Sequence, residues 1–376
     1  DTSQPERTKL FHLLKAAWPL PVDEFFPLAY PFSPTDHVFT DARVVVREDE
    51  PSSIIAFTLD SQNYREQLAN SRQSRSDAPL TELPHADGSH YLYEFDTETI
   101  KLWCKIFFAE QFDALRHMCG CAEQFVQSLS RCFKWDSRGG KSGSAFLKTR
   151  DDRFVVKQLS RTELDGFSKF APQYFTYLAE CQSALRPTAL TKIFGYFRIG
   201  FKNTHTGRSF KMDFMVMENL LYGRSVDRIF DLKGSTRHRF VQESGQPHEV
   251  LQDENLMQRA QSSPLLVREH SKRILRTALH NDSLFLTEMN VMDYSLIMAL
   301  DTSRNKMVIG IIDYLRTYTW DKRVESFVKE TAILGGGGKG EPTIITPRQY
   351  RMRFLTFLDR NILMTPDPWI QSGWVQ

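Results

Sequence analysis

The stretch from 290 to 320, NVMDYSLIMALDTSRNKMVIGIIDYLRTYTW, constrains the fold of this chain more than any other segment. Two apolar runs, YSLIMAL and MVIGIIDYL, flank the turn-rich DTSRNK, a pattern that predicts a β-hairpin. Asp293 enters the first strand and Asp313 ends the second, so the hairpin brings both carboxylates to the same edge. Phosphoryl transfer uses such a pair, one carboxylate near the attacking hydroxyl and one on Mg²⁺.

The same two aspartates could instead cap turns or helix ends, where Asp is common. The apolar residues that precede them, VM and IGII, favour the functional interpretation. Carboxylates in apolar surroundings need a strong partner, and we therefore expect both to have one.

A glycine-rich segment, SRGGKSGSAFLKTRDDRFVVKQ (137–158), carries Gly139, Gly140 and Gly143 ahead of two predicted strands joined at TRDD. The glycines do not form a Walker A loop, which needs a glycine where this chain has Trp135, nor the GxGxxG of a dinucleotide-binding fold. A glycine turn followed by a strand lysine, Lys157, matches the plan of a kinase N-lobe, in which both contact ATP phosphates. An ordinary hairpin turn with an exposed lysine has the same local sequence.

Two further segments fit the kinase plan. Glu163 lies on a helix predicted after Lys157, where a kinase places the carboxylate that orients its lysine. MVMENL (215–220), with Met217 and Glu218, occupies the place of the hinge that pairs with adenine. A solvated glutamate and an edge strand are the alternatives for these two features.

A third candidate is the basic segment FDLKGSTRHRF (230–240), preceded by YGRSVDR. Arg224, Lys233 and Arg237, together with Arg228 and Arg239, give a local positive excess in a chain whose net charge is only +2. Such a cluster suits a phosphorylated headgroup, because arginine can bind phosphate oxygens bidentately. A charged run exposed to water has the same composition.

Composition limits the remaining possibilities. With 376 residues, 41% of them hydrophobic, the chain can bury a large core and form more than one compact unit. Its nearly balanced charge gives no general polyanion-binding signature, and we expect no nucleic-acid partner. The five cysteines form no CxxC pair, which argues against a zinc site and fits a reducing compartment. No apolar run approaches the roughly 20 residues that span a bilayer, so we expect any membrane to be met from the aqueous side.

We expect four segments along the chain. Residues 1–66, of unknown packing, contain ARVVVREDEPSSIIAFTLDS, whose two apolar runs predict short strands, and residues 67–88 have the polar composition of a linker. Residues 89–219 contain strands and one helix beginning near 160. Residues 220–376 contain the hairpin, one long helix or two with a break at HND over LLVREHSKRILRTALHNDSLFLTEMN, and a last helix over PRQYRMRFLTFLDRNILM.

Several segments together resemble the phosphatidylinositol phosphate kinase family, most closely its PIKfyve-type phosphatidylinositol 3-phosphate 5-kinases. They are GGKSGSAF, RFVVKQ, MVMENLLYGR, FDLKGS, MDYSL, GIIDYLRTYTWDK and GGGGKGEPTIITP. The resemblance covers roughly residues 89–369, and the order DLKGS, MDYSL, IIDYLRT is highly specific. It implies an α+β, two-lobed kinase-like fold with an antiparallel sheet in the N-lobe (89–219) and a mixed α/β C-lobe (220–376).

The resemblance also implies roles for single residues. Lys157, supported by Glu163, would hold ATP phosphates; Asp293 would position or deprotonate the inositol hydroxyl; Asp313 would bind Mg²⁺; Lys233 would face the phosphorylated substrate. Residues 315–346 correspond to the activation loop of the family, where Lys322 and Arg323 stand among apolar side chains in a mixture suited to an anionic bilayer surface.

The family further implies ATP and Mg²⁺ as cofactors and a phosphoinositide lipid as substrate. Other regions of a longer chain and regulatory scaffold proteins are the expected partners, at the cytosolic face of endosomal or vacuolar membranes. The chain has no His-Arg-Asp triplet, and Met298 stands where a protein kinase has the Asn that binds a second metal ion, which favours a lipid kinase. A kinase for the 4- or 5-monophosphate lipid and a phosphoinositide-binding scaffold without turnover stay open as alternatives.

Overall fold

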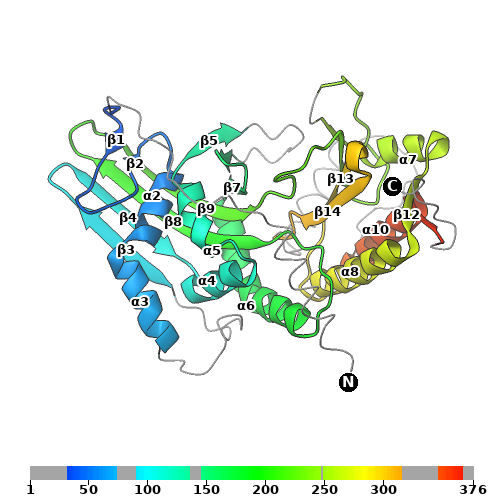
Figure 1. The fold of residues 1–376 in the computed structure, drawn as a ribbon, viewed down its shortest axis with the longest axis horizontal. Helices are drawn as coiled ribbons and strands as arrows, with labels where there is room; N and C mark the ends of the chain where they lie inside the picture. Colours follow the sequence, from blue (N-terminus) through cyan, green and yellow to red (C-terminus); the bar gives the residue numbers. More distant parts are fainter. Residues whose placement is uncertain (1–31, 74–89, 136–144, 247–248, 316–345, 367–376) are drawn as a thin grey trace, which may run out of the picture. The chain divides into compact units, whose positions relative to one another are not determined.

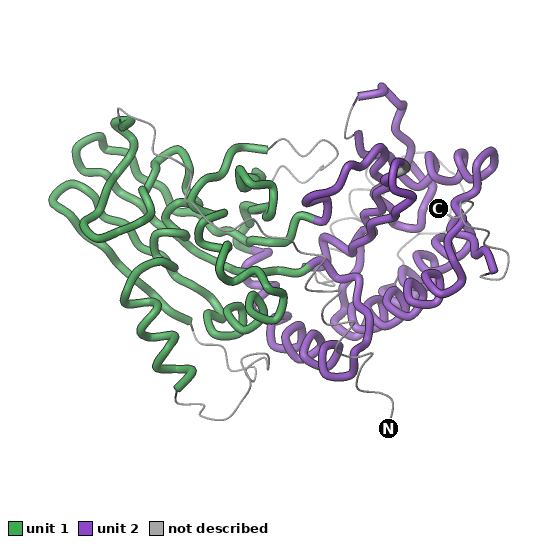
Figure 2. Tube along the Cα trace, viewed as in Figure 1, with its two compact units in different colours: residues 1–136, 143–161, 192–219 green, residues 137–142, 162–191, 220–376 purple. Residues whose placement is uncertain are grey.

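A computed structural model of the chain describes residues 32–73, 90–135, 145–246, 249–315 and 346–366 (Figure 1). The chain divides into two compact units, coloured in Figure 2. Unit 1 comprises 1–136, 143–161 and 192–219, and unit 2 comprises 137–142, 162–191 and 220–376. Within the described ranges, no helix combines the length and the hydrophobicity needed to cross a bilayer.

Unit 1 is built on a seven-stranded antiparallel sheet with the strand order β3-β4-β8-β9-β7-β6-β5. The period-two alternation of the sequence forms β4, in which Leu102 and Cys104 face the core and are at most 1% exposed. The strands are β3 (Tyr91–Asp96), β4 (Ile100–Ile106), β5 (Cys132–Trp135), β6 (Phe146–Thr149), β7 (Phe154–Gln158), β8 (Ile193–Asn203) and β9 (Ser209–Glu218).

Residues 32–73, whose packing the sequence left open, belong to the core of unit 1. Phe57 meets Phe95 of the sheet edge-on at 4.8 Å between ring centroids, and Glu48 accepts a hydrogen bond from Asn203 Nδ2 at 2.9 Å. The two-stranded ladder of β1 (Asp36–His37) and β2 (Val46–Arg47) precedes α2 (Ser52–Asp60) and α3 (Gln62–Gln73), and α4 (Ala109–Met118) and α5 (Ala122–Leu129) follow β4.

Two expectations for this region are wrong. The run SSIIAF forms helix α2 and not a strand, and every residue of α2 is buried. A short helix that is buried on all sides has no exposed polar face to set a 3.6-residue period in its sequence, so the run resembles a strand. Helix α3 continues to Gln73, so the predicted linker begins inside a helix.

Unit 2 contains a four-stranded sheet with the order β11-β10-β13-β14. The predicted hairpin is confirmed: β13 and β14 pair antiparallel, with Ser295 opposite Ile312. The strands are β10 (Arg228–Leu232), β11 (Val250–Leu251), β13 (Ser295–Asp301) and β14 (Lys306–Ile312), and a separate parallel pair joins β12 (Leu265–Arg268) to β15 (Ile362–Thr365).

Unit 2 contains helices in both segments of residues 220–376 where the sequence predicts them. One unbroken helix covers EHSKRILRTALHNDSLFLTE from Glu269 to Glu288, whereas the LLVR before it, which the prediction included in the helix, forms a strand. Thr346 caps the last helix, with Pro347 in its first turn. The helices are α6 (Arg161–Ser183, whose first residue belongs to unit 1), α7 (Asp253–Ser262), α8 (Glu269–Glu288) and α10 (Pro347–Asn361), and a short 3₁₀ turn, η1 (Thr302–Arg304), joins β13 to β14.

The predicted α+β class is confirmed by these separate, largely antiparallel sheets and their helices. The predicted division between 219 and 220 coincides with a boundary between units, whereas residues 162–191 group with unit 2 and not with the strands around them. The assignment of the segments to kinase lobes stays a prediction.

Candidate functional site

The hairpin brings Asp293 and Asp313 to the same end of the four-stranded sheet. Ser295 and Ile312 are partners in the ladder, Asp293 stands two residues before the first, and Asp313 directly follows the second. The sequence prediction that these carboxylates share an edge is therefore confirmed in geometry, while their chemical roles stay predictions.

Both aspartates have a left-handed backbone, with φ of 64° at Asp293 and 60° at Asp313. Residues other than glycine pay roughly 1–3 kcal/mol for this conformation, which persists only where the surrounding structure imposes it. Both side chains are exposed. The apolar residues that precede the two aspartates therefore do not bury them, because the left-handed residue interrupts the in-and-out alternation of the strand.

A buried tyrosine after each aspartate fixes this backbone. The carbonyl of Tyr294 accepts a hydrogen bond from the hydroxyl of Tyr350, and the two rings meet edge-on at 4.8 Å. The hydroxyl of Tyr314 donates to the carbonyl of Thr191. Burial raises the pKa of Tyr350, which keeps its phenol in the donor form. In each Asp-Tyr pair, an exposed aspartate is therefore followed directly by a tyrosine that packs in the core.

Lys233 of the DLKGS segment meets one of these aspartates directly. Its Nζ donates a hydrogen bond to the backbone carbonyl of Asp293 at 2.8 Å. The strands explain the proximity, because Leu232 at the end of β10 lies opposite Leu296 of β13. Two residues that the sequence singled out separately therefore lie together.

Asp253, which the sequence analysis missed, holds the DLKGS loop. Its carboxylate is fully buried and accepts hydrogen bonds from the backbone N–H groups of Lys233, Gly234 and Ser235 and from Arg239 Nε, with the shortest distances between 2.7 and 3.3 Å. Burial raises the pKa of Asp253, and the bonds from Arg239 and the backbone oppose that shift. The only sequence signal was an acidic residue at the start of a helix, which does not reveal a partner 20 residues earlier.

The basic cluster is more nearly neutral than its sequence indicates. Arg228 pairs with Glu243 at 3.3 Å, and Arg239 pairs with Asp231 at 2.9 Å as well as with Asp253. Arg224 and Arg237 are exposed. Arg228 and Arg239 thus form ion pairs within the protein, and the role of Lys233, Arg224 and Arg237 in substrate binding stays a prediction.

In unit 1, Lys157 lies on β7 opposite Met215 of β9 and is only 4% exposed. Its Nζ lies 6.0 Å from the centroid of the Phe146 ring on the neighbouring strand. The position on a central strand agrees with the prediction and excludes the alternative of an exposed lysine. Glu163 lies in the first turn of α6, in unit 2, and its pairing with Lys157 stays a prediction.

The predicted hinge is the end of β9. Met217 lies opposite Val155 of β7 and Ile193 of β8. The backbone N–H of Glu218 donates to the carbonyl of Lys192 at 3.0 Å, and its carboxylate accepts from the N–H of Lys192 at 2.6 Å. The segment is therefore held in place by its neighbours, and its contact with adenine stays a prediction.

Several predicted site residues lie outside the described residues. They are Gly139, Gly140 and Gly143 of the glycine turn and Lys322 and Arg323, with most of the predicted activation loop, 315–346. Their assignments stay predictions.

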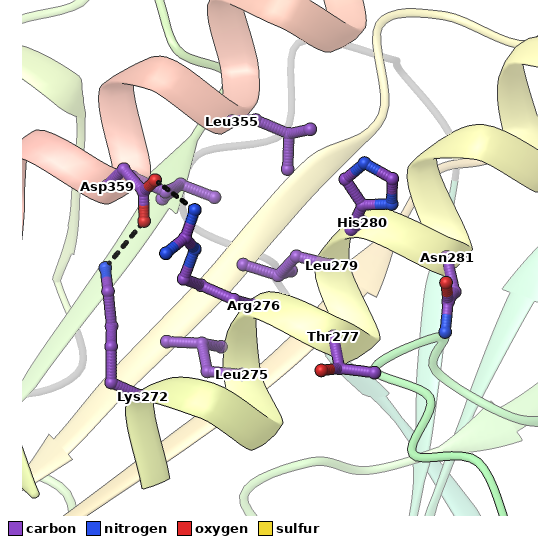
Figure 3. Close-up of a pocket in the computed structure, with 10 residues that line it drawn as sticks. Lys272, Leu275, Arg276, Thr277, Leu279, His280, Asn281, Leu355 and Asp359 are labelled. Carbon is purple, nitrogen blue, oxygen red and sulfur yellow. Dashed lines mark ion pairs between the residues drawn. The ribbon is translucent and has the colours of Figure 1, made fainter. Parts of the chain in front are cut away.

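A cavity of about 360 Å³ in unit 2 lies between α8 and α10. Figure 3 shows Lys272 and Arg276 directed toward Asp359, with Nζ–Oδ1 and Nη2–Oδ2 distances of 2.9 and 3.6 Å. Its lining contains none of the residues predicted for the site. Two cations of its lining pair with Asp359, and the cavity is separate from the aspartate edge in the residues that form it.

Fold and site together define a class: an α+β chain of the kinase type, with a strand lysine in one unit and an acidic hairpin edge in the other. Comparison with known families narrows this class. The family described as Phosphatidylinositol-4-phosphate 5-Kinase matches residues 128–307 and 300–361. The chain belongs to this family.

Individual relatives agree with the family assignment. The chain is 40% identical over 463 aligned residues to the 1-phosphatidylinositol 3-phosphate 5-kinase FAB1 of Saccharomyces cerevisiae, covering 99% of this chain and 20% of that protein. It is 44% identical over 306 residues to the human 1-phosphatidylinositol 3-phosphate 5-kinase, covering 80% of this chain and 14% of the relative. It is 49% identical over 245 residues to a putative 1-phosphatidylinositol 3-phosphate 5-kinase of Drosophila melanogaster, covering 65% of this chain and 13% of that protein. The chain thus spans about a fifth or less of the length of these relatives.

Proposed function

We propose that this chain is the kinase region of a lipid kinase that transfers the γ-phosphate of ATP to the 5-hydroxyl of phosphatidylinositol 3-phosphate, giving phosphatidylinositol 3,5-bisphosphate. Membership of the family supports ATP as the phosphoryl donor. The names of the relatives support the 3-phosphate lipid as substrate and the 5-position as the site of transfer.

The observation that carries the proposal is the shared edge of Asp293 and Asp313, with Lys233 bonded to the first of them. Asp293 is the proposed base: its exposed carboxylate takes the proton of the inositol hydroxyl while that oxygen attacks the γ-phosphorus of ATP, and the bond from this phosphorus to the bridging oxygen breaks to release ADP. Arg224, Arg237 and the remaining donors of the Lys233 ammonium are proposed to hold the phosphate that the lipid already carries.

Asp313 and Lys157 fit the proposed cofactors. An exposed carboxylate such as Asp313 is the hard oxygen ligand that Mg²⁺ takes, together with nucleotide phosphates. When bound, Mg²⁺ neutralises the charge that develops on the transferred phosphoryl group. Lys157, with Gly139, Gly140, Gly143, Glu163, Met217 and Glu218, is proposed to bind ATP.

The lipid substrate places the proposed work at a membrane surface. We assign it to the cytosolic face of endosomal or vacuolar membranes, reached peripherally, with Lys322 and Arg323 as contacts to anionic lipid. Other regions of a longer chain and scaffold proteins are the proposed partners there.

The test is phosphate transfer from radiolabelled ATP with Mg²⁺ to vesicles that contain each phosphatidylinositol monophosphate in turn, with the products separated by ring position. We expect label at the 5-position of the 3-phosphate lipid, lost in Asp293→Asn. Label on the 4-phosphate lipid, which the description of the family names, would contradict the proposed substrate and keep the kinase. No transfer to any of the lipids would contradict the proposed function and favour a scaffold.

A further inference from the structure

The buried carboxylate of Asp253 accepts hydrogen bonds from the backbone of the DLKGS loop. A carboxylate offers about four lone-pair sites, and four donors meet this one: three consecutive N–H groups of the DLKGS loop and Arg239 Nε. Consecutive N–H groups that converge on one anion fix the loop conformation far more tightly than a single bond does. The loop therefore depends on this buried charge for its shape.

The loop has little room to move on its other side. Gly234 has φ of +72°, and a Cβ placed there would lie 2.6 Å from the Cα of Phe354 on α10. Only glycine fits so close to the helix backbone. Hydrogen bonds to Asp253 therefore hold the loop on one side, and close contact with the backbone of α10 restricts it on the other.

From this fixed backbone the side chain of Lys233 reaches the carbonyl of Asp293 at 2.8 Å. The next carbonyl, that of Tyr294, accepts from Tyr350, again on α10. Two consecutive carbonyls at the left-handed residue are thus held by donors that belong to the loop and to the helix that supports the loop.

We propose that Asp253 is a positioning residue for Asp293. It fixes the backbone of Lys233, and Lys233 Nζ in turn sets the orientation of the Asp293–Tyr294 peptide group and the direction of the Asp293 carboxylate. Asp253 does not touch the substrate. The inference rests on the proposed function for its effect on activity, and its effect on the peptide group is measurable without that function.

A purely structural role predicts something different, and Asp282 provides the matched control. It is also fully buried in unit 2 and accepts hydrogen bonds from Tyr177, Thr188 and the N–H of Ala189, at 2.6 to 2.8 Å. These three partners belong to α6 and to residues 188–189, and none of the three belongs to the DLKGS loop or to the aspartate edge. Asp282→Asn should therefore cost stability as Asp253→Asn does, without the same effect on Asp293.

The sequence allows the peptide group to be observed directly. It contains two Asp-Tyr dipeptides, 293–294 and 313–314. Labelling with ¹³C-carbonyl aspartate and ¹⁵N-tyrosine therefore gives two carbonyl–nitrogen cross-peaks, one for each strand end. We expect Asp253→Asn and Lys233→Met to move the 293–294 peak and leave the 313–314 peak in place, and Asp282→Asn to leave the 293–294 peak in place.

Activity supplies the second readout. We expect Asp253→Asn to lower kcat about 100-fold, as a displacement of about 1 Å can do, with KM for ATP unchanged. In a Lys233→Met background, the same substitution should lower kcat no more than about 2-fold further, because its effect passes through Lys233.

The outcomes separate the two hypotheses. A 293–294 peak that Lys233→Met moves but Asp253→Asn does not, or fully additive losses of kcat, would overturn the positioning role. If wild-type protein transfers no phosphate, the proposed function fails, and the cross-peaks alone decide the inference. If Asp253→Asn does not fold, Arg239→Lys releases one of the four donors more gently and must move the same peak.

Discussion

Unit 2 contains two pairs of aspartates that differ in burial. Asp253 and Asp282 are fully buried, and hydrogen-bond donors surround their carboxylates. Asp293 and Asp313 are exposed, stand at the ends of paired strands and have a left-handed backbone. A buried acid whose oxygens are hydrogen-bonded to the protein contributes to the fold, whereas an exposed acid on a constrained backbone can be reached by a ligand from solvent.

The comparison separates what holds the fold from what can do chemistry. Substitution of a buried acid should cost stability, because its donors are left in the core without acceptors. Substitution of an exposed acid should cost activity and little stability. The predictions below test this separation, from the largest expected effect to the smallest.

Asp313→Asn should have the largest effect. The amide keeps the size of the side chain but loses the charge that we propose for Mg²⁺, so phosphate transfer should fall roughly 10³-fold, about 4 kcal/mol in activation free energy. Transfer measured against Mg²⁺ concentration checks this, and the variant should need more Mg²⁺. Unchanged transfer would remove Asp313 from the proposed site.

Asp282→Ala should lower the free energy of unfolding by about 3 kcal/mol, because the Tyr177 and Thr188 hydroxyls and the Ala189 N–H lose their acceptor. Urea unfolding measures the change. Asp313→Ala is the matched control and should shift the free energy by less than about 1 kcal/mol. Equal losses of unfolding free energy in the two variants would contradict the prediction that buried acids stabilise the fold more than exposed acids do.

Gly234→Ala should lower the free energy of unfolding by about 2 kcal/mol. The substitution forces a side chain into a left-handed backbone and against the backbone of Phe354. Gly207→Ala is the control, because its φ is +72° as well but a Cβ there meets nothing within 4 Å. Thermal unfolding of both variants checks this, and an equal effect would show that the close contact with α10 adds nothing.

Asp293→Gly should have the smallest effect on stability, between no change and a gain of about 1 kcal/mol. Glycine relieves the left-handed backbone, and its greater freedom in the unfolded chain offsets part of that gain. The same variant should lose phosphate transfer. A clear loss of stability, measured by urea unfolding, would mean that the Asp293 side chain holds the fold after all.

The sequence predicted the aspartate edge because the two signals involved are local. Alternating apolar residues around DTSRNK predict the hairpin, and strand pairing then fixes where the flanking aspartates lie. It did not predict their exposure, since the left-handed backbone depends on the burial of Tyr294 and Tyr314 against helices far away in the chain.

Other features depend on tertiary contacts that no local pattern records. Helix α2 was missed because burial on all sides removes its periodicity. Asp253 was missed because its donors lie on a loop about 20 residues earlier, and the charge of the basic cluster was overestimated because Arg239 pairs with that same buried acid.

The most direct test compares Asp293→Asn with Asp282→Asn in the same preparations, by melting temperature and by single-turnover phosphate transfer at a temperature where both are folded. We predict that Asp293→Asn melts within about 2 °C of wild type and transfers phosphate roughly 10³-fold more slowly. Asp282→Asn should melt several degrees lower and transfer phosphate within a few-fold of wild type. An active Asp293→Asn, or an inactive Asp282→Asn that is still folded, would contradict the division between the acids that hold the fold and the acids proposed for the chemistry.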